Sequence, residues 1–337
     1  MFRIKSVKHF AIALLAFVIL VSAILFYANI KKNETPDFSG DTQAMMIEGD
    51  EHYIKKNYKK AFYWYEKAAQ DGEAYAQYKL GVMYANGYFV KQDYEKAFYW
   101  YEKSAQQGYV GAQCNLGVMY FNGNFIKQDY KKAFYWYEKA AQQGNATAQY
   151  GLGDMYMHGY FVKRNFKKAF YWFEKAAQQG HATAQVNLGK MYDNGYFVRR
   201  DYKKAFYWFE KAAQQGDATA QTNLGTMYYK AEGVRQDYKK AFYWTEKAAN
   251  QGYPYAQYGL GCMYYEGEGV SQDYKKAFYW FEKAANQGYP DAQYNLGVMY
   301  TLGEGVKQNE QKSLYWFKKA AEQGYKDAQK FLDENFK

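Results

Sequence analysis

The side chains that could perform chemistry are few and scattered. The four histidines, His9, His52, His158 and His181, do not recur at a fixed spacing, and no pair has a metal-ligand pattern such as His-Glu-x-x-His. The chain has no Gly-x-x-x-x-Gly-Lys phosphate loop and no Gly-x-Ser-x-Gly nucleophile elbow. Residues 151–153 read Gly-Leu-Gly, but no strand pattern precedes them. The sequence therefore predicts a protein that is not an enzyme and that binds no cofactor or metal.

Tryptophan marks the organisation of the chain. A spacing of 36 residues separates each tryptophan from the next, and a fixed period of this size is typical of repeat arrays. The sequence therefore predicts about eight 36-residue repeats. The tryptophans are Trp64, Trp100, Trp136, Trp172, Trp208, Trp244, Trp280 and Trp316.

The tryptophan half of each repeat is predicted to be a helix, which we call helix B. In one copy, Asp129 can cap the amides of the first turn, residues 130–143 contain no proline or glycine, and Gly144 ends the helix. Four consecutive aromatic residues, 134–137, span about 300° of the helix surface, so they cannot all face a core. Tyr135 shares its face with charged residues. We expect an outer ladder of such tyrosines, which either contacts glycan or protein or covers neighbouring lysine stems.

The other half of each repeat is predicted to be helix A, at about residues 74–86 in one copy. Its Ala, Leu, Met and Tyr positions, exemplified by Ala76, Leu80 and Met83, recur on one face and predict the packing surface. A glycine follows the leucine in seven copies, although glycine in a helix is about 1 kcal/mol less favourable than alanine. We expect another backbone to approach there, with the helix B alanines, such as Ala133, as partners.

The repeat resembles a known family, the Sel1-like repeat, a relative of the tetratricopeptide repeat. The resemblance covers about residues 42–337. It implies an all-α fold, a right-handed α/α superhelical solenoid of about eight helix-turn-helix repeats, used as a scaffold or adaptor for other proteins and often found in the bacterial envelope. The motif residues of one copy are Ala256, Leu260, Gly261, Tyr264, Gly267, Gly269, Val270, Asp273, Lys276, Ala277, Trp280, Lys283, Ala284, Ala285 and Gly288.

One loop position departs from this family pattern. The second loop glycine is present as Gly233, Gly269 and Gly305, but the earlier repeats carry phenylalanine. Because phenylalanine is disfavoured at positive φ, we expect a different turn in those loops. The rings either form an exposed row or fold back onto neighbouring repeats. They are Phe89, Phe125, Phe161 and Phe197.

The first residues predict a membrane segment. Basic residues precede an apolar run from Phe10 to Ala28, which is long enough for a bilayer core. We favour an uncleaved anchor, and Val21-Ser22-Ala23 leaves a cleaved signal as the alternative. The basic N-terminus favours repeats outside the cytoplasm, and Lys31 and Lys32 after the apolar run leave the opposite topology as the alternative. The predicted organisation is a basic segment at 1–9, an anchor or signal at 10–30, a linker at 31–41, repeats at 42–324 and a capping helix at 325–337.

Charge and cysteine content exclude several classes. The formal net charge is +10, but residues 1–32 hold five basic residues and no acids, so the repeats carry an excess of only five. Lysine and glutamate are interspersed, which predicts no specific nucleic-acid binding. Cys114 and Cys262 lie four repeats apart and cannot form a disulfide with each other. Some relatives carry a cysteine pair in each repeat; its absence here argues against the β-lactamase-like hydrolase activity attributed to them.

A variable stripe on helix A is the candidate partner-binding site. Positions equivalent to 75, 79, 82 and 86 share one face and change from copy to copy, whereas the packing face does not. We expect this stripe to line a concave groove that recognises a protein. Neutral drift on a solvent face is the alternative. The candidate residues are Lys79, Val82, Asn115, Asp154, His158, Asn187, Lys190, Asn223, Thr226 and Lys230.

The sequence therefore predicts a membrane-anchored protein-interaction scaffold, held in the bacterial inner membrane by residues 10–28 as a single-pass protein with periplasmic repeats. The alternative is an exported periplasmic or secreted repeat protein that binds cell-wall glycan. A β-lactamase-like hydrolase is the third and least favoured possibility. The identity of the protein partner is not predicted.

Overall fold

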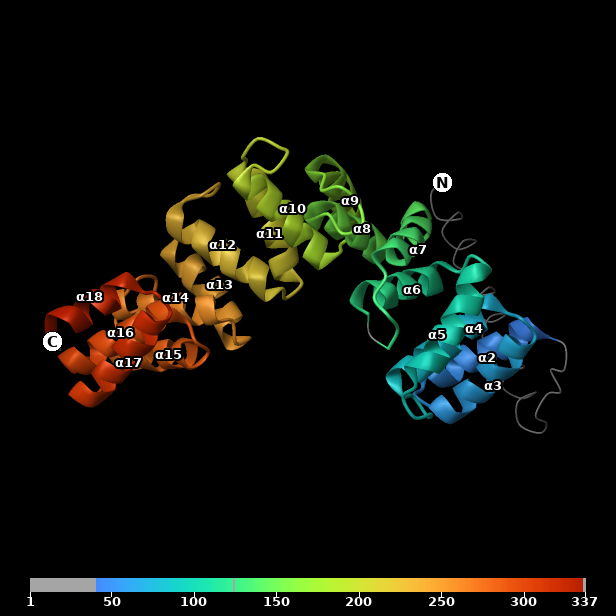
Figure 1. The fold of residues 1–337 in the computed structure, drawn as a ribbon, viewed down its shortest axis with the longest axis horizontal. Helices are drawn as coiled ribbons and strands as arrows, with labels where there is room; N and C mark the ends of the chain where they lie inside the picture. Colours follow the sequence, from blue (N-terminus) through green and yellow to red (C-terminus); the bar gives the residue numbers. More distant parts are fainter. Residues whose placement is uncertain (1–40, 124, 336–337) are drawn as a thin grey trace, which may run out of the picture. The chain divides into compact units, whose positions relative to one another are not determined.

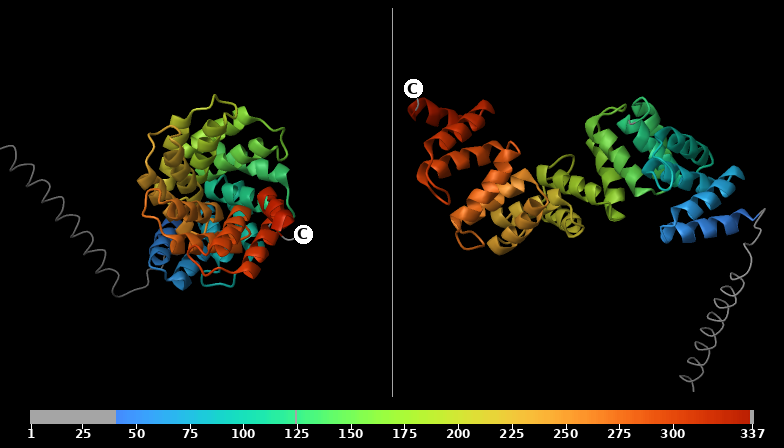
Figure 2. Two further views of the ribbon diagram at one scale, coloured as in Figure 1. Left: turned by 90° about the vertical axis from the view of Figure 1, so that its left-hand side faces the viewer. Right: turned by 90° about the horizontal axis from the view of Figure 1, so that it is seen from below.

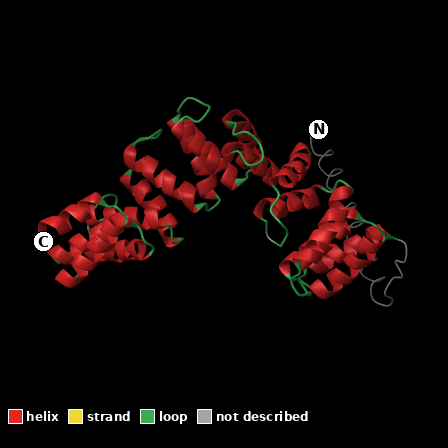
Figure 3. Ribbon diagram, viewed as in Figure 1, coloured by secondary structure: helices red, strands yellow, loops and turns green. Residues whose placement is uncertain are grey.

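Every regular element of the described chain is an α-helix (Figures 1 and 3). The structure, a computed structural model, describes residues 41–123 and 125–335. Within these ranges it contains 17 helices and no strand. Their bounds are α2 Thr42–Ile54, α3 Tyr58–Gln70, α4 Ala74–Asn86, α5 Tyr94–Gln106, α6 Val110–Asn122, α7 Tyr130–Gln142, α8 Ala146–His158, α9 Phe166–Gln178, α10 Ala182–Asn194, α11 Tyr202–Gln214, α12 Ala218–Lys230, α13 Tyr238–Asn250, α14 Pro254–Glu266, α15 Tyr274–Asn286, α16 Pro290–Leu302, α17 Glu310–Glu322 and α18 Lys326–Asn335.

The chain divides into two compact units. Unit 1 ends at Trp100 and unit 2 runs from Tyr101 to the C-terminus. The predicted basic segment, the predicted anchor and nearly all of the predicted linker lie outside the described residues. Among the residues that are described, no helix is long and apolar enough to cross a membrane. The right-handed superhelix and the concave position of helix A stay predictions.

The helix boundaries follow from their capping residues. The Asp129 carboxylate accepts from the Lys132 amide at 3.0 Å and so satisfies one free donor of the first turn of α7. Gly144 has φ +89°, the left-handed conformation that ends a helix. Pro254 occupies the first turn of α14, where its missing amide removes no helical bond. The predicted helices A and B are confirmed in each of these copies.

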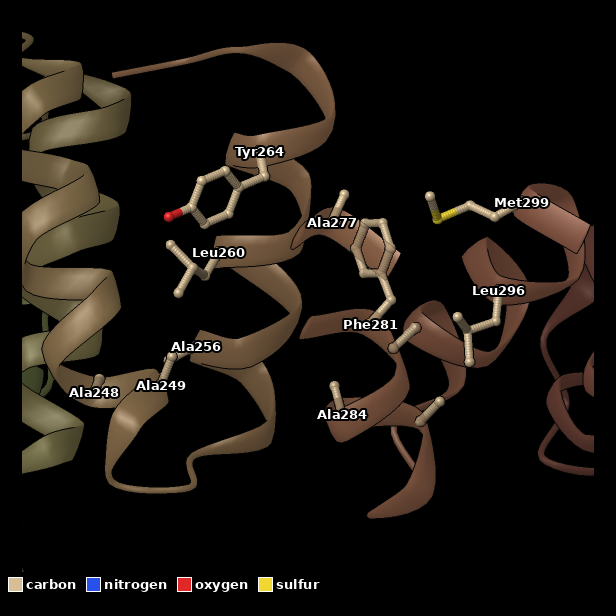
Figure 4. Close-up of a cluster of buried hydrophobic side chains, with 12 residues drawn as sticks. Ala248, Ala249, Ala256, Leu260, Tyr264, Ala277, Phe281, Ala284, Leu296 and Met299 are labelled. Carbon is tan, nitrogen blue, oxygen red and sulfur yellow. The ribbon is translucent and has the colours of Figure 1, made fainter. Parts of the chain in front are cut away.

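Within unit 2 each helix packs mainly on the helices immediately before and after it in the chain. Figure 2 shows these pairs following one another from α6 to α18, without a common centre. The buried side chains accordingly form successive clusters. In Figure 4, Phe281 of α15 lies with Ala277 between Leu260 of α14 and the residues Leu296 and Met299 of α16. The constant face of helix A is therefore the packing face, as predicted.

The glycine inside helix A makes room for an aromatic ring. A Cβ at Gly261 would lie 2.6 Å from the ring of Phe281, the helix B residue of the same repeat. The expectation that another backbone fills this space is therefore wrong for these repeats, since the neighbour is a side chain. The same relation joins Gly49 to Tyr65, Gly117 to Tyr137, Gly153 to Phe173, Gly189 to Phe209 and Gly297 to Phe317.

A buried glutamine of helix A links successive repeats, and the sequence reasoning missed it. Gln149 of α8 donates from Nε2 to the Ala141 carbonyl of α7, and its Oε1 accepts from Gln179 Nε2 at 2.8 Å. Both hydrogen-bonding ends of a buried amide are thus satisfied. Among the described residues, no buried side-chain nitrogen or oxygen lacks a partner. The equivalent pairs are Gln143–Gln113, Gln215–Gln185, Gln251–Gln221, Gln287–Gln257 and Gln323–Gln293.

The loop phenylalanines adopt the conformation that glycine has elsewhere. Phe161 has φ +62° and Gly269 has φ +74°, so the expectation of a different backbone conformation at this position is wrong. The Phe161 ring is 53% exposed and contacts Phe134 of the preceding helix B, with 5.8 Å between ring centroids. Both expectations for the rings therefore hold in part. Phe89, Phe125 and Phe197 share the positive φ and are equally exposed.

The first and last helices of the described chain each bury apolar residues against a neighbouring helix, and their role as caps stays a prediction. Met45 of α2 is buried, whereas Ile47 is half-exposed. In α18, Ala328 is buried at the register of the other helix A alanines, and Phe331 packs on Phe317 at 4.0 Å between ring centroids. Nothing of comparable size packs beyond them within the described chain, which is the arrangement that repeat arrays require at their ends.

Candidate functional site

The variable stripe of unit 2 lies at the edge of the packed face of helix A. The asparagines Asn115, Asn187 and Asn223 are half-buried, and the Asn223 Nδ2 donates to the Thr219 carbonyl of its own helix at 2.9 Å. Further along the same face, Lys190 of α10 and Lys230 of α12 are exposed. The stripe thus offers amide and ammonium groups to solvent beside a buried apolar core.

A carboxylate lies on this stripe in a position where burial disfavours its charge. The Asp154 side chain is only 20% exposed, and its Oδ1 is 3.1 Å from Nδ1 of His158 one turn later. Burial raises the pKa of Asp154 above its ordinary value of 3.8, and His158 opposes that shift in part. Tyr150 lies near the carboxylate. The structure therefore brings the two predicted residues Asp154 and His158 together as one polar group on α8.

Two further predicted residues, Thr226 and Lys230, line a cavity of about 220 Å³ between α12, α13 and α14. Its other walls include Tyr255 and Cys262 of α14, at stripe positions of the next repeat. Because Lys230 and Tyr255 are exposed, the cavity opens on the variable face. A hollow of about 270 Å³ lies at the equivalent place one repeat on, where Glu266, Asn295 and Val298 of the stripe line it together with Phe281.

One wall of the cavity is a residue that departs from the repeat pattern. At the helix B position held by Phe209 and Phe281 in the adjacent repeats, α13 has Thr245. The helix glycine is nevertheless present, and a Cβ at Gly225 would lie 2.5 Å from Thr245 Oγ1. On the other side a Cβ at Gly259 would meet only the Thr245 methyl, at 3.5 Å. The backbone of α13 also lies close to Gly225, since the Ala241 carbonyl oxygen would be 3.3 Å from an added Cβ.

The thiol and phenol in this cavity are not activated groups. Burial raises the pKa of the Cys262 thiol to about 11, although a hydrogen bond with the Tyr258 hydroxyl acts in the opposite direction. Burial likewise raises the pKa of Cys114 to about 11. Since the thiolate is the nucleophile, burial disfavours the reactive form of both cysteines near neutral pH. Both are free, as predicted.

In unit 1 the stripe residue Lys79 is engaged inside the protein. Its Nζ is 3.3 Å from Asp50 Oδ1 and 4.1 Å from the centroid of the Tyr53 ring, and its side chain is 16% exposed. Tyr65 and Tyr75 donate to the same carboxylate oxygen at 2.6 Å. Burial alone would raise the pKa of Asp50, but these hydroxyls and the ammonium hold it below its usual value. Val82 is half-buried on the same helix. Partner binding by Lys79 stays a prediction.

The two histidines of unit 2 have structural contacts. His181 caps α10, where its Nδ1 accepts from the Ala184 amide at 3.3 Å. Its ring stacks on Tyr150, and burial lowers its pKa below the ordinary 6.5. Residues 41–123 and 125–335 contain no cluster of three or more His, Cys, Asp or Glu side chains able to hold a metal.

The tyrosine ladder on helix B is half-exposed, as expected. Tyr135 is 49% exposed, with the Lys139 ammonium 5.0 Å from its ring centroid and Trp136 at its edge. Tyr63, Tyr171, Tyr207, Tyr243 and Tyr279 repeat this contact with a lysine four residues on. The rings therefore cover lysine stems, and contact with glycan stays a prediction.

The sequence reasoning missed the residues that make the cavity, above all Thr245, Tyr229 and Tyr258. The signal was present. Comparison of the helix B copies position by position shows one Thr where seven copies have Tyr or Phe. Because a single exception does not disturb the repeat pattern, Thr245 does not stand out among the residues that recur.

Comparison with known proteins agrees with this architecture. The model of the Sel1 repeat matches eight consecutive segments, 44–73, 74–109, 110–145, 146–181, 182–217, 218–253, 254–289 and 290–325. No curated protein matches the chain.

Two solved structures are similar along most of the chain. A protective antigen of uropathogenic Escherichia coli with an SLR fold is 38% identical with a TM-score of 0.77, over 86% of this chain and 63% of the antigen. This chain therefore spans less than two thirds of the antigen's length. A Sel1 repeat protein from Oxalobacter formigenes is 35% identical with a TM-score of 0.63, over 88% of each chain. With eight matched repeats that cover most of its length, the chain belongs to the Sel1 repeat family.

Proposed function

We propose that the protein is a scaffold that binds another protein along the variable stripe of helix A. Sel1 repeats are protein-interaction modules, which supports the general class. The observation that carries the proposal is the difference between two faces of one helix. The buried Ala, Leu, Gly and Met positions recur, whereas the stripe positions vary in charge and size and keep contact with solvent.

Asp154 supports this proposal from energetics. Valine holds its register in α4, α6 and α16, so the fold does not require a carboxylate there. The pKa of Asp154 is raised by burial, which means that its ionised form is disfavoured in the folded protein. A charged residue that the fold neither needs nor favours is well explained by contact with a partner.

Partner capture by matched variants tests the proposal. The full-length protein carrying Asp154→Ala, Lys190→Ala and Thr226→Ala is compared with one carrying Lys167→Ala, Lys203→Ala and Lys239→Ala on helix B, where the lysines are exposed. After crosslinking in native membranes, we expect the first variant to lose the proteins that the wild type captures and the second to keep them. Equal capture by both variants at equal melting temperature rules out the stripe as the binding face.

We further propose that residues 10–28 anchor the protein in the bacterial inner membrane, with the repeats in the periplasm. The length and apolar character of that run support this proposal. An anchored protein stays with membranes after a carbonate wash and is degraded by protease added to spheroplasts. Release by carbonate, with an N-terminus that begins after Ala23, supports the cleaved alternative instead.

A second candidate function is binding of cell-wall glycan. The specific observation in its favour is a hollow of about 490 Å³ on unit 2, lined by the aromatic residues Tyr207 and Trp208 together with Gln178, Gln214 and Lys211. Aromatic faces with amide donors suit sugar rings. Co-sedimentation with purified peptidoglycan tests this candidate, and Trp208→Ala serves as the variant that must lose it.

A further inference from the structure

We propose that the loops 159–165 and 195–200 of unit 2 form an edge that lies on the surface of an anionic lipid bilayer. Phe161 and Phe197 enter the membrane interface, and the cations beside them contact the lipid phosphates. This inference uses neither the stripe of helix A nor residues 10–28, so it goes beyond the proposed function.

The two loops are neighbours, and both present aromatic rings to solvent. The Phe161 side chain is 53% exposed and that of Phe197 is 51% exposed. Tyr196 of the second loop stacks on Phe166, the residue that follows the first loop, with 5.5 Å between ring centroids. The exposed phenylalanines therefore follow one another along one edge of unit 2, one repeat apart.

The fold does not need phenylalanine at these positions. Phe161 and Phe197 have φ +62° and +67°, a conformation that glycine adopts more easily than a residue with a side chain. The Phe197 ring contacts Phe170 of the preceding helix B. One repeat on, Phe206 has Gly233 in place of that covering ring and is only half-buried. Because packing does not require the strained phenylalanines, a contact outside the protein explains them.

The charge of this edge is positive. Each loop carries two exposed cations, and among the residues that the structure describes no carboxylate forms an ion pair with any of the four. The later loops have a glutamate beside their glycine, as at Glu232 and Glu268. Each Lys or Arg near an anionic membrane surface strengthens attachment roughly fivefold. The cations are Lys163, Arg164, Arg199 and Arg200.

The uniformity of the two loops favours lipid over protein as the occupant. Residues 159–164 and 195–200 both read Gly-Tyr-Phe-Val followed by two basic residues. A fluid bilayer presents the same phosphates and acyl chains to successive repeats, whereas a protein presents different side chains to each. Aromatic rings beside long basic side chains are also the combination that suits a membrane interface, where the rings lie deeper than the charges.

Fluorescence quenching in lipid nanodiscs tests the edge. The full-length protein carries dansylalanine at position 197, or at position 271 in a later loop as the control, and the discs contain nitroxide-labelled phosphatidylcholine. When phosphatidylglycerol is present, we expect quenching at position 197 and at least threefold less at position 271. Without phosphatidylglycerol, we expect at least threefold less quenching at position 197. No quenching at position 197, or equal quenching at the two positions or in the two kinds of disc, overturns the inference.

A charge variant that copies a later loop tests the role of the cations. Arg199→Ser and Arg200→Gln introduce the residues Ser271 and Gln272. The substitution at Arg200 keeps a local contact, because Gln272 donates to the Tyr274 hydroxyl as Arg200 does to the Tyr202 hydroxyl. We expect the double variant to keep its Tm and to reduce quenching at position 197 at least fivefold. Undiminished quenching contradicts the role of these cations.

A second variant guards against a folding failure, and partner capture separates this inference from the proposed function. Phe161→Gly restores the residue of the later loops, so we expect weaker quenching with an equal or higher Tm. If the charge variant loses quenching but still captures the partner, the edge binds lipid. If it keeps quenching but loses the partner, the edge binds protein and the membrane inference is wrong.

Discussion

A side chain added at Gly261 would collide with the ring of Phe281, because the added Cβ would lie 2.6 Å from two atoms of that ring. Phe281 is almost fully buried. The pairing of a helix A glycine with a helix B ring is therefore the packing unit of the array, and the first prediction concerns it.

Gly261→Ala should destabilise the protein by about 1–3 kcal/mol, because overpacking outweighs the gain of about 1 kcal/mol in helix propensity. Gly259→Ala is the matched control on the same helix. Its Cβ would meet only the Thr245 methyl at 3.5 Å, an ordinary contact, so we expect it to stabilise slightly. Urea unfolding followed by circular dichroism measures both. Equal changes in the free energy of unfolding for the two substitutions would show that the Phe281 ring does not determine what position 261 tolerates.

The loop glycines of the later repeats should be less tolerant than the glycines after helix B. Gly269 has a positive φ and lies against the Tyr238 carbonyl, so Gly269→Ala meets both backbone strain and a collision with main chain. Gly288 also has a positive φ, but no atom lies within 4 Å of an added Cβ. We expect Gly288→Ala to lose about 1 kcal/mol and Gly269→Ala at least twice as much. Comparable losses in thermal unfolding would contradict this reading of the loop.

Acid should weaken the α10 cap. Burial lowers the pKa of His181 in the folded protein below 6.5, so the unfolded chain binds the proton more readily. Stability from this residue is complete above about pH 6.5 and falls as pH drops toward the lowered value. His181→Asn, which copies Asn145 of the previous repeat, should remove this dependence. Between pH 7.5 and 5.5 we expect the variant to lose about 1–3 °C less in Tm than the wild type. Parallel pH curves would show that the ring does not titrate there.

Asp154→Val should stabilise the fold and impair binding. At pH 7 the ionised carboxylate is disfavoured by burial, and valine is the residue of three other repeats at this register. We expect a gain of about 0.5–1.5 kcal/mol at pH 7. The gain should shrink near pH 4, because a carboxylate with a raised pKa is least favourable when it is ionised. A pH-independent gain, or a loss, would mean that the pair with His158 stabilises the fold.

The repeats, the helix bounds and the packing face could be predicted from the sequence because each depends on local signals that recur eight times. An aspartate and a glycine at the spacing of Asp129 and Gly144 delimit a helix wherever this pair occurs. The ring beside each helix glycine could not be predicted, because glycine indicates a missing side chain without naming what fills the space. The backbone conformation of Phe161 could not be predicted either, because phenylalanine disfavours the positive φ that this residue adopts.

The candidate site could be predicted only as a stripe. Variation among copies located Asp154, Lys190 and Thr226, but it did not reveal which residues the fold engages internally. Lys79 is held by Asp50 of the divergent first repeat. The sequence of that repeat does not follow the pattern of the other copies, so it could not be compared with them position by position. Thr245 lies on helix B, outside the stripe, and faces Gly225 and Gly259 of two neighbouring helices. Such a combination of exceptions is visible only in three dimensions.

Site-specific photocrosslinking tests the central claim most directly. A benzophenone amino acid is placed at Lys190 on α10, in the stripe, and separately at Lys203 on α11, on the helix B surface of the same repeat. In cells at native expression, the account predicts a discrete crosslinked partner from position 190 and none from position 203. Crosslinking from position 203 alone would contradict the account and place recognition on helix B.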